Sequence, residues 1–336
     1  RRFEERFSDP AFAAQRPAIE ALGQIAREAY DQGRKSPVTR RAGTGHADPD
    51  YEVSVDWLAT RDAIRDAAVR HADKGQRARI LLICASPRND KTCPGEMSKT
   101  FRMSEAAAEQ LRGQGAEVDL LDLSQITSEY GKVIYPCKGC VSTAMPLCHW
   151  PCSCYPNHAL GQVDDWMSSI YPRWVAAHGV MIVTPVHWYQ APSVLKLMID
   201  RLVCADGGNP DPSSTHGKKP EEAKALELAG WPYPRHLAGR SFAVIVHGDA
   251  AGTEALRHAL TDWLSDMRLV PAGSLSCIDR LVGYLAPYAS SHDALDRDPA
   301  MLGEVRNAAR ALLASVMQRR GGAHAPDEGL AEPRPK

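Results

Sequence analysis

Cysteine is concentrated in one short stretch of the chain. Of the nine cysteines, five fall between positions 137 and 154, and these are Cys137, Cys140, Cys148, Cys152 and Cys154. Thiolates separated by two residues can chelate one metal ion, and four thiolates can hold zinc or an iron–sulfur cluster. Cysteine is also a small and often buried residue, so reduced thiols packed around a turn would give the same pattern. The residues alone therefore leave an iron–sulfur cluster, zinc and no metal as open alternatives.

A second group of candidate residues follows the apolar run at 80–83. Five side chains that can bind an anion come after it, at Ser86, Arg88, Ser98, Lys99 and Thr100. A helix is expected to begin near Met97, and a helix N-terminus offers unpaired amides and partial positive charge to a phosphate. The spacing of a P-loop is absent. The alternative is that Ser98 only caps its helix and that Arg88 is a solvated surface charge.

A third group follows the apolar run at 180–183, in the order Pro185, Val186, His187, Trp188 and Tyr189. This loop presents backbone amides and two aromatic rings at the carboxyl end of an expected strand, the edge where α/β sheets bind ligands. Gly248 and Asp249 follow a later apolar run in the same way. His187 and Tyr189 are the candidate catalytic residues. The alternative is an ordinary turn with both aromatic rings packed inside the protein.

The elements that must position these residues alternate between strand and helix. Strands are expected at 77–85, 117–123, 180–184, 241–246 and 269–277, and helices at 97–112, 160–177, 192–203, 252–267 and 301–319. Such alternation predicts an α/β fold with a parallel sheet covered by helices on both faces. Five strands favour a flavodoxin-like, doubly wound sheet of order 2-1-3-4-5. In that order the loops at 86–98, 185–190 and 247–251 meet at one edge of the sheet.

The remaining segments surround this domain. We expect residues 1–75 to form an N-terminal helical arm, with helices near 12–30 and 51–71, that packs on the domain or on a partner subunit. The α/β domain is expected to span 76–320, with a cysteine-rich insertion at 135–158 and a loop insertion at 205–234. The Gly- and Pro-rich tail at 321–336 is expected to be disordered.

The composition of the chain limits the kinds of partner that it is expected to bind. The chain has 336 residues, 44% hydrophobic content and a net charge of −1. No global charge favours nucleic acid or an anionic membrane, and no apolar run approaches the roughly 18 residues of a membrane span. The start of the sequence shows no secretory signal. An odd number of cysteines argues against a disulfide framework. We therefore expect a cytoplasmic protein with reduced thiols that binds neither nucleic acid nor membrane.

Three of these stretches resemble the NADPH-dependent FMN reductase family, within the flavodoxin-like quinone reductase superfamily. Residues 82–88 (LICASPR) are similar to its first strand and G-S-x-R phosphate loop, with Ala85 in the usual Gly position. Residues 184–188 (TPVHW), with the LK at 195–196 and the IDR at 199–201, are similar to its T-P-x-Y-x…LK…iDR segment. Residues 247–249 (HGD) are similar to its third loop beside the flavin.

The resemblance implies bound FMN at the strand ends and NAD(P)H as co-substrate. It places Ser86, Arg88, Ser98, Lys99 and Thr100 around the phosphate. It places residues 185–189 along the isoalloxazine, largely through backbone amides, with Gly248 and Asp249 at the other edge. The implied function is an FMN-dependent NAD(P)H oxidoreductase that reduces a small acceptor such as a quinone or a nitro compound. It also implies a homodimer or homotetramer.

The cysteine segment is similar to the compact cysteine motif of iron–sulfur flavoproteins, which share this fold. That similarity implies a [4Fe-4S] cluster near FMN, held by cysteines of the set from Cys137 to Cys154. The alternative function is then an electron carrier between protein partners. A third hypothesis, of another class, is a non-catalytic regulator that binds flavin or metal.

Overall fold

A parallel sheet forms the centre of the protein. The computed structural model describes residues 4–32, 38–93, 95–155 and 165–322. The strands of the central sheet are β3 (Arg79–Cys84), β4 (Glu117–Asp122), β5 (Gly179–Pro185), β6 (Ser241–Gly248), β7 (Val270–Pro271) and β8 (Cys277–Leu281). Their order is β4-β3-β5-β6, with β7 and β8 both paired to the far side of β6. All pairs in this sheet are parallel.

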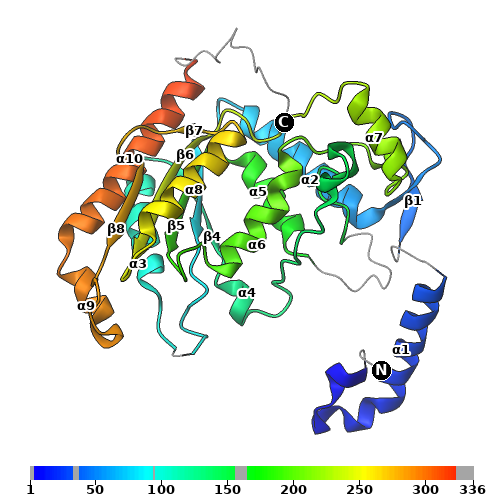
Figure 1. Ribbon diagram of the computed structural model, residues 1–336, viewed down its shortest axis with the longest axis horizontal. Helices are drawn as coiled ribbons and strands as arrows, with labels where there is room; N and C mark the ends of the chain where they lie inside the picture. The colour runs from blue at the N-terminus through cyan, green and yellow to red at the C-terminus, as the bar shows by residue number, and fades with distance from the viewer. Residues whose placement is uncertain (1–3, 33–37, 94, 156–164, 323–336) are drawn as a thin grey trace.

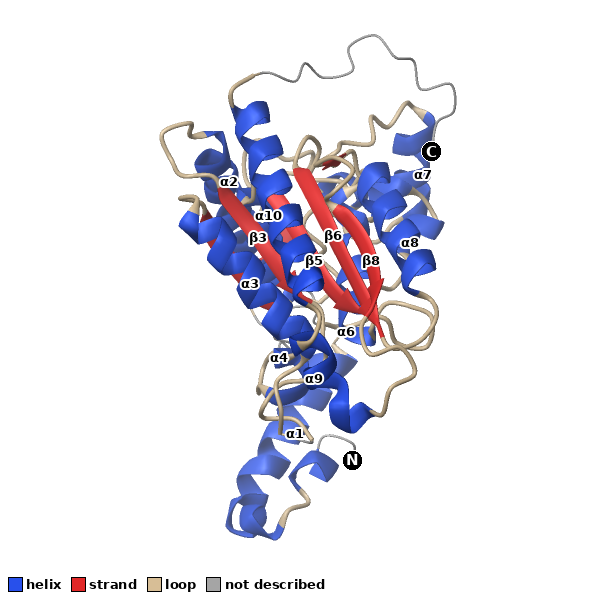
Figure 2. Ribbon diagram, turned by 90° about the vertical axis from the view of Figure 1, so that its left-hand side faces the viewer, coloured by secondary structure: helices blue, strands red, loops and turns tan. Residues whose placement is uncertain are grey.

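Aliphatic side chains on both faces of the strands explain why the sheet is buried. In β3, Ile80 and Leu82 point to one face, where α3 (Lys99–Gly113) and α10 (Pro299–Arg320) cover them. Leu81 and Ile83 point to the other face, which α5 (Met167–Ala176), α6 (Ser193–Arg201) and α8 (Thr253–Asp266) cover. Figure 2 shows α3 and α10 lying across the first face. Such strands are hydrophobic throughout because neither face meets water.

The predicted fold class and the order 2-1-3-4-5 are confirmed, and the fifth strand differs in detail. The sequence predicts one strand over 269–277, whereas the structure has two short pieces, β7 and β8. The amides of Val270 and Ala272, on either side of Pro271, donate to the Arg240 and Phe242 carbonyls, so Pro271 occupies a position whose amide would face away from β6. Gly273, at φ +109°, then begins a turn that the Ser276 amide closes on the Gly273 carbonyl.

The N-terminal region has two parts. The first contains η1 (Glu4–Phe7), η2 (Pro10–Gln15) and α1 (Arg16–Asp31), and it projects away from the sheet in Figure 1. The second contains an antiparallel pair that the sequence did not predict, β1 (Thr39–Arg41) with β2 (Glu52–Ser54), and then α2 (Val55–Ala72). Ile64 of α2 joins the core beside α5. Val69, further along α2, is 71% exposed.

The two insertions contact one another. The segment at 205–234 contains η6 (Pro212–Thr215) and α7 (Pro220–Leu228), and the cysteine segment contains η3 (Cys140–Ser142) and η4 (Met145–Leu147). Asn209 Nδ2 donates to the Pro146 carbonyl at 3.0 Å, and the Met145 amide donates to Glu227 Oε1 at 3.0 Å. The predicted insertion at 205–234 is therefore partly helical rather than only a loop.

Several predictions fall outside the described residues. These are the 156–158 end of the cysteine-rich insertion, the 160–164 start of a predicted helix, and positions 323–336 of the predicted tail. The division into 1–75, 76–320 and 321–336 stays a prediction. None of the described helices combines the length and the apolar character needed to cross a membrane.

Candidate functional site

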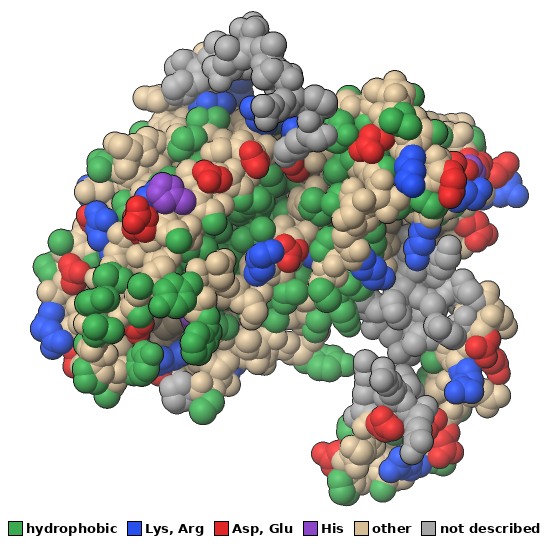
Figure 3. All heavy atoms as spheres, viewed as in Figure 1, with side chains coloured by type: hydrophobic (Ala, Val, Ile, Leu, Met, Phe, Trp, Pro, Cys, Tyr) green, Lys and Arg blue, Asp and Glu red, His purple; other side chains and the backbone are tan. Residues whose placement is uncertain are grey.

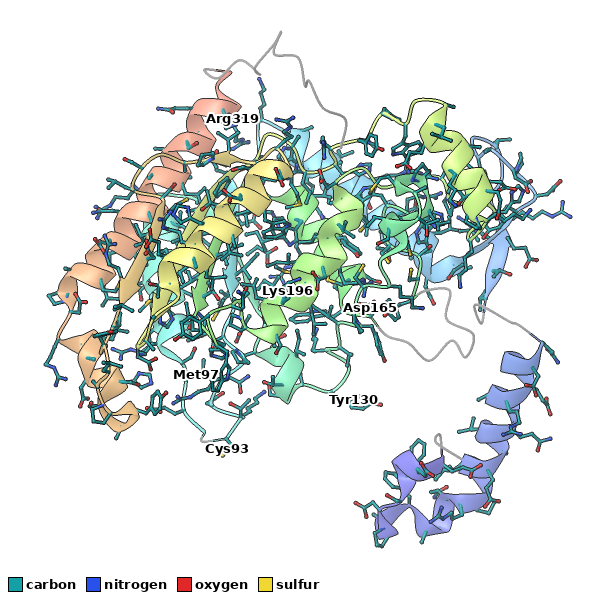
Figure 4. The ribbon with its side chains drawn as sticks, in the orientation of Figure 1. Cys93, Met97, Tyr130, Asp165, Lys196 and Arg319 are labelled. Carbon is teal, nitrogen blue, oxygen red and sulfur yellow. The ribbon has the colours of Figure 1, made fainter. Side chains whose placement is uncertain are left out.

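A cavity of about 680 Å³ lies at the carboxyl ends of β3, β5 and β6. All of the residues predicted from the sequence to bind a cofactor line it, namely Ser86, Arg88, Ser98, Lys99, Thr100, Pro185, Val186, His187, Trp188, Tyr189, Gly248 and Asp249. In Figure 4 this edge of the sheet is the one beside Met97. The parallel order brings the three loops together, as the sequence predicts.

The loop after β3 is held in place before it reaches α3. Ser86 Oγ accepts a hydrogen bond from the Arg88 amide at 3.1 Å. Asn89 Nδ2 donates to Ser124 Oγ at 2.8 Å, which ties the loop to the segment after β4. Ser98 is the N-cap of α3, because its Oγ accepts from the Phe101 amide at 3.1 Å. The first turn of α3 therefore faces the cavity in a fixed orientation.

The two cations of this loop differ in their surroundings. The guanidinium of Arg88 forms an ion pair with Glu96, and Nε of Arg88 also donates to the Glu96 carbonyl at 3.1 Å. The second carboxylate oxygen of Glu96 lies 3.3 Å from Nε2 of His292. Lys99 has no carboxylate this close, and its Nζ reaches only the Val282 carbonyl at 3.4 Å among the described residues. Arg88 is therefore not the solvated surface charge considered above.

Lys99 and His247 have lowered pKa values for related reasons. Burial lowers the pKa of Lys99, and Asp249 partly opposes that effect. His247 is buried, and burial followed by the charges of Lys99 and His187 lowers its pKa to about 3. His247 is therefore neutral at neutral pH. The cavity thus contains one partly buried lysine beside a neutral imidazole.

His247 lines the cavity and was not among the predicted site residues. Its Nε2 shares a hydrogen bond with Thr100 Oγ1 at 2.8 Å. Its Nδ1 is buried and has no hydrogen-bond partner among the described residues. The sequence signals for His247 were its position directly before Gly248 and Asp249 at the end of an apolar run and the resemblance of residues 247–249 to the family's third loop. Those signals locate the residue. They do not reveal that the imidazole is buried or that only one of its two ring nitrogens is hydrogen-bonded to a described residue.

The loop after β5 is a tight turn with an unusual backbone. The His187 amide donates to the Gln190 carbonyl at 3.0 Å, and the Gln190 amide donates back to the His187 carbonyl at 3.0 Å. The two central residues have positive φ, +48° at Trp188 and +66° at Tyr189. Glycine and asparagine usually occupy such positions, because other side chains are strained there. Strain of this kind is typical of functional sites.

The turn directs both aromatic rings outward. Trp188 is 94% exposed and Tyr189 is 63% exposed, so the alternative in which they pack inside the protein is wrong. The sequence predicts that the backbone amides of residues 185–189 face the ligand, but two of them already bind groups within the protein. The Val186 amide donates to the His247 carbonyl, and the His187 amide is used in the turn. The amides of Trp188 and Tyr189 donate no hydrogen bond to a described residue.

A glycine allows this turn to approach the start of α8. Gly252 is the N-cap residue of α8 and has φ +110°. A Cβ atom at this position would lie 3.0 Å from the Tyr189 Cα. Any larger residue would therefore push the turn outward as well as strain its own backbone.

A fourth segment closes one side of the cavity. η7 (Tyr288–Ser290) and α9 (Ser291–Asp296) bring Tyr288, Ser291 and His292 to its lining. Sequence reasoning did not include them in the site, although the aromatic residues before His292 were a visible signal. The segment is attached to α3, because Arg102 pairs with Asp296 of α9.

The predicted metal ligands do not form a metal site in the structure. Among the described residues, no three Cys, His, Asp or Glu side chains are grouped so that they could hold a metal ion. The Sγ atoms of Cys140 and Cys154 lie 3.6 Å apart. The hydrogen bond between them lowers the pKa of Cys140. It is also the largest cause of the raised pKa of Cys154, which is about 11. Cys148 is buried. The structure therefore gives no support to the expected [4Fe-4S] cluster or to zinc at Cys137, Cys140, Cys148, Cys152 and Cys154.

His149, beside Cys148, is not available as a ligand either. Its Nδ1 lies 2.6 Å from Ser153 Oγ, and its Nε2 lies 3.0 Å from Thr215 Oγ1. Burial lowers its pKa to about 4. Both ring nitrogens are therefore paired with hydroxyl groups, and the contact with Thr215 joins the two insertions.

Comparison with known proteins agrees with this geometry. The sequence model of the NADPH-dependent FMN reductase family matches residues 78–279. The crystal structure of RosB with bound 8-demethyl-8-formylriboflavin-5'-phosphate is 13% identical, covers 74% of this chain and 83% of its own, and has a TM-score of 0.51. An NAD(P)H:quinone oxidoreductase from Methanothermobacter marburgensis is 16% identical, covers 70% of this chain and 98% of its own, and has a TM-score of 0.42. No curated protein sequence matches the chain. At such identities the RosB likeness shows the fold alone.

Proposed function

The chain belongs to the NADPH-dependent FMN reductase family, and on that basis we propose that it binds FMN in the cavity at the ends of β3, β5 and β6. It is a flavin-dependent oxidoreductase, and the proposed reaction passes electrons from NAD(P)H to a small acceptor such as a quinone or a nitro compound. The observation that carries the proposal is that the residues expected around a flavin line one cavity. The RosB structure, which shares the fold, is described with a flavin 5'-phosphate bound.

The start of α3 suits the phosphate of FMN. The helix has 15 residues, and the amides of Lys99 and Thr100, which donate to no described residue, are available to an anion together with the partial positive charge of the helix. Ser86 and Thr100 add hydroxyl groups beside it. Lys99 adds a partly buried ammonium group, and its only hydrogen bond among the described residues is to a carbonyl. An anionic ligand would stabilise that charged group, since burial alone disfavours it.

The unpaired nitrogen of His247 fits a ligand with a polar group. A buried polar atom without a partner costs about 1–3 kcal/mol. His247 Nδ1 is such an atom, and its residue lines the cavity. A bound flavin offers both donors and acceptors along its ring edge and ribityl chain. We therefore assign His247 a binding role that adds to the residues inferred from sequence.

The turn after β5 suits the edge of the isoalloxazine. The amides of Trp188 and Tyr189 point away from the turn's own hydrogen bonds, and no described residue accepts from them. A residue held in a strained region costs about 1–3 kcal/mol, which a protein retains where the geometry serves a function. In the proposal these two amides, rather than all those of residues 185–189, bind the ring.

The protein's own contribution to the reaction is orientation, exclusion of water and proton placement. Bound FMN would supply the reversible redox chemistry that links NAD(P)H to an acceptor. His187 is neutral near pH 7 because burial lowers its pKa, so its imidazole can donate or accept a proton at the cavity wall. Tyr189 lies at the rim, with its ring exposed. We propose His187 as the group that exchanges protons there and Tyr189 as a contact for the acceptor.

Apolar side chains around the mouth of the cavity favour a planar acceptor. Trp188, Tyr189 and Tyr288 line it, and Tyr288 is 83% exposed. Aromatic rings stack on flat, conjugated molecules with little loss of side-chain freedom. A quinone or nitroaromatic acceptor would therefore bind between this rim and the flavin.

The same rim favours self-association. Trp188, Tyr284, Leu285 and Tyr288 are all exposed and lie on the segments that border one cavity. Contiguous exposed apolar side chains often mark an interaction surface. We propose a homodimer or homotetramer in which a second copy covers part of this rim.

An anaerobic experiment tests the proposed reaction. Purified protein with FMN receives NADPH or NADH, and loss of the flavin absorbance is followed before and after addition of a benzoquinone or a nitroaromatic compound. Reduction of the flavin and acceptor-dependent turnover are expected, with iron assayed on the same sample. Absence of both would refute the proposed function. About four irons per chain together with FMN would replace it with the iron–sulfur electron carrier.

A further inference from the structure

Two thiols of the cysteine segment touch one another. Cys140 is the first residue of η3, Cys154 lies fourteen positions later, and their Sγ atoms are 3.6 Å apart. A disulfide has an S–S length of about 2.05 Å. Closure of this contact therefore needs the two sulfurs to approach by only ~1.5 Å. Neither residue lies in the central sheet, so this movement does not disturb a strand.

The ends of the segment are already held together without a covalent bond. The Tyr155 hydroxyl donates to the Pro136 carbonyl, and the rings of Tyr135 and Tyr155 stack with centroids 4.9 Å apart. Arg201 of α6 lies over the Tyr155 ring at 4.6 Å. Since Tyr155 follows Cys154 directly, these contacts fix Cys154 opposite Cys140. The thiol contact therefore belongs to a packed structure rather than to an isolated loop.

A hollow of about 450 Å³ lies beside the pair. Cys137, Gly139 and Val141 line it, so both neighbours of Cys140 face it. The opposite wall comes from α6 and α8, including Trp263. In Figure 3 apolar side chains gather between these two helices. Cys140 itself is partly exposed. The lining of the hollow includes Cys137 but neither Cys140 nor Cys154, so a molecule in the hollow would lie next to Cys140 and not against it.

A positive charge lies beside the pair. Lys138, two positions before Cys140, places its Nζ 4.8 Å from the centroid of the Tyr155 ring, directly after Cys154. Lys138 attracts an anionic reagent at moderate salt, whereas Asp200, Asp206 and Asp266 in the lining of the hollow oppose that attraction. Oxidised glutathione, a small disulfide with several carboxylates, has that charge.

Two of the neighbouring thiols are buried, whereas Cys137 is partly exposed like Cys140. Cys204 and Cys148 are buried, at 0% and 6% exposure. Cys152 is the remaining neighbour of Cys154, and only Ser153 separates the two. Cys152 also interacts with Cys154, and the sulfur-to-sulfur distance of 3.6 Å is the one between Cys154 and Cys140. Cys140 and Cys154 are therefore the pair that the geometry favours.

We propose that Cys140 and Cys154 form a reversible disulfide by exchange with a low-molecular-weight disulfide. Cys140, as thiolate, attacks one sulfur of the reagent, its S–S bond breaks, and the first thiol leaves. The Cys154 thiol then loses its proton to solvent and attacks the Cys140 sulfur, which releases the second thiol. The cysteines are oxidised by two electrons, and the reagent is reduced to two thiols. Excess reduced glutathione reverses both steps.

Mass mapping tests this site independently of flavin binding. Reduced, full-length protein is incubated with oxidised glutathione, alkylated, digested and analysed by mass spectrometry. A cross-linked peptide that contains Cys140 and Cys154, lighter by two hydrogens, is expected in the wild type. In Cys154→Ser, glutathione should accumulate on Cys140. In Cys152→Ser, the same cross-link should still form. Circular dichroism verifies that each variant is folded.

Cys277→Ser serves as the matched control, because Cys277 is also a partly buried thiol and lies in β8, far from the segment in the chain. It should leave the cross-link unchanged. The proposal is overturned if Cys140 and Cys154 are alkylated as fully as before oxidation, or if the cross-link joins Cys140 to Cys152. It is also overturned if the purified protein holds iron or zinc that Cys140→Ser removes, since the thiols are then metal ligands.

Discussion

Lys99 provides the sharpest test of where the cofactor phosphate binds. Its ammonium group is partly buried at the start of α3, with the Val282 carbonyl as its only hydrogen-bond partner among the described residues. A charge-assisted hydrogen bond contributes about 1.5–3 kcal/mol. Lys99→Met should therefore weaken FMN binding about 10- to 100-fold, since each 1.4 kcal/mol is tenfold. Riboflavin, which lacks the phosphate, should bind the variant as well as it binds the wild type.

The assay is an equilibrium titration of the protein into each flavin, followed by flavin fluorescence. Lys196→Met is the control, because Lys196 lies on α6, pairs with Asp200 and does not line the cavity (Figure 4). The melting temperature of Lys99→Met should not fall, because burial lowers the pKa of Lys99 and so disfavours its charge in the free protein. The reasoning is refuted if FMN and riboflavin lose affinity equally, or if FMN affinity does not change.

Three further results are expected. Glu96→Gln releases Arg88 from its ion pair, so FMN affinity should rise by up to about fivefold, the range of an exposed pair; a flavin titration that shows weaker binding would count against this. Tyr189→Gly removes strain at φ +66°, so the melting temperature should rise by the equivalent of about 1 kcal/mol while acceptor turnover falls; a lower melting temperature would contradict it. The pKa of His247 is about 3 in the folded protein against an ordinary 6.5. Below pH 6.5 the unfolded chain binds a proton that folded His247 does not, so the free energy of unfolding should fall as pH drops toward 3. Urea titrations should show a flatter decline for His247→Asn, and parallel curves would exclude His247 as the cause.

The sheet and the place of the cavity could be predicted because their signal is local. The apolar runs of β3, β5 and β6 are continuous, as expected for strands buried on both faces, and each ends in a polar or aromatic loop. The parallel order then places those loops at one edge without further information. The short β1 and β2 gave no such signal, because each has only three residues and β1 is exposed throughout.

Contacts between distant segments could not be predicted. Glu96 lies between Arg88 and His292, and nothing in the spacing of these residues marks a shared ion pair. The turn at Trp188 and Tyr189 lacks the Asn-Gly pair that usually signals positive φ. The contact between Cys140 and Cys154 could not be predicted either. The spacing of the cysteines is compatible with metal binding, while the structure places Cys140 against Cys154.

The central claim is that the cavity at the strand ends holds one FMN. Isothermal titration of the purified protein with FMN, in phosphate-free buffer and again with added inorganic phosphate, tests it most directly. We expect one FMN per chain, with an affinity that inorganic phosphate lowers by competition for Lys99 and the start of α3. No FMN binding, or binding that Gly252→Val leaves unchanged although its side chain would press on the turn at Tyr189, would contradict it.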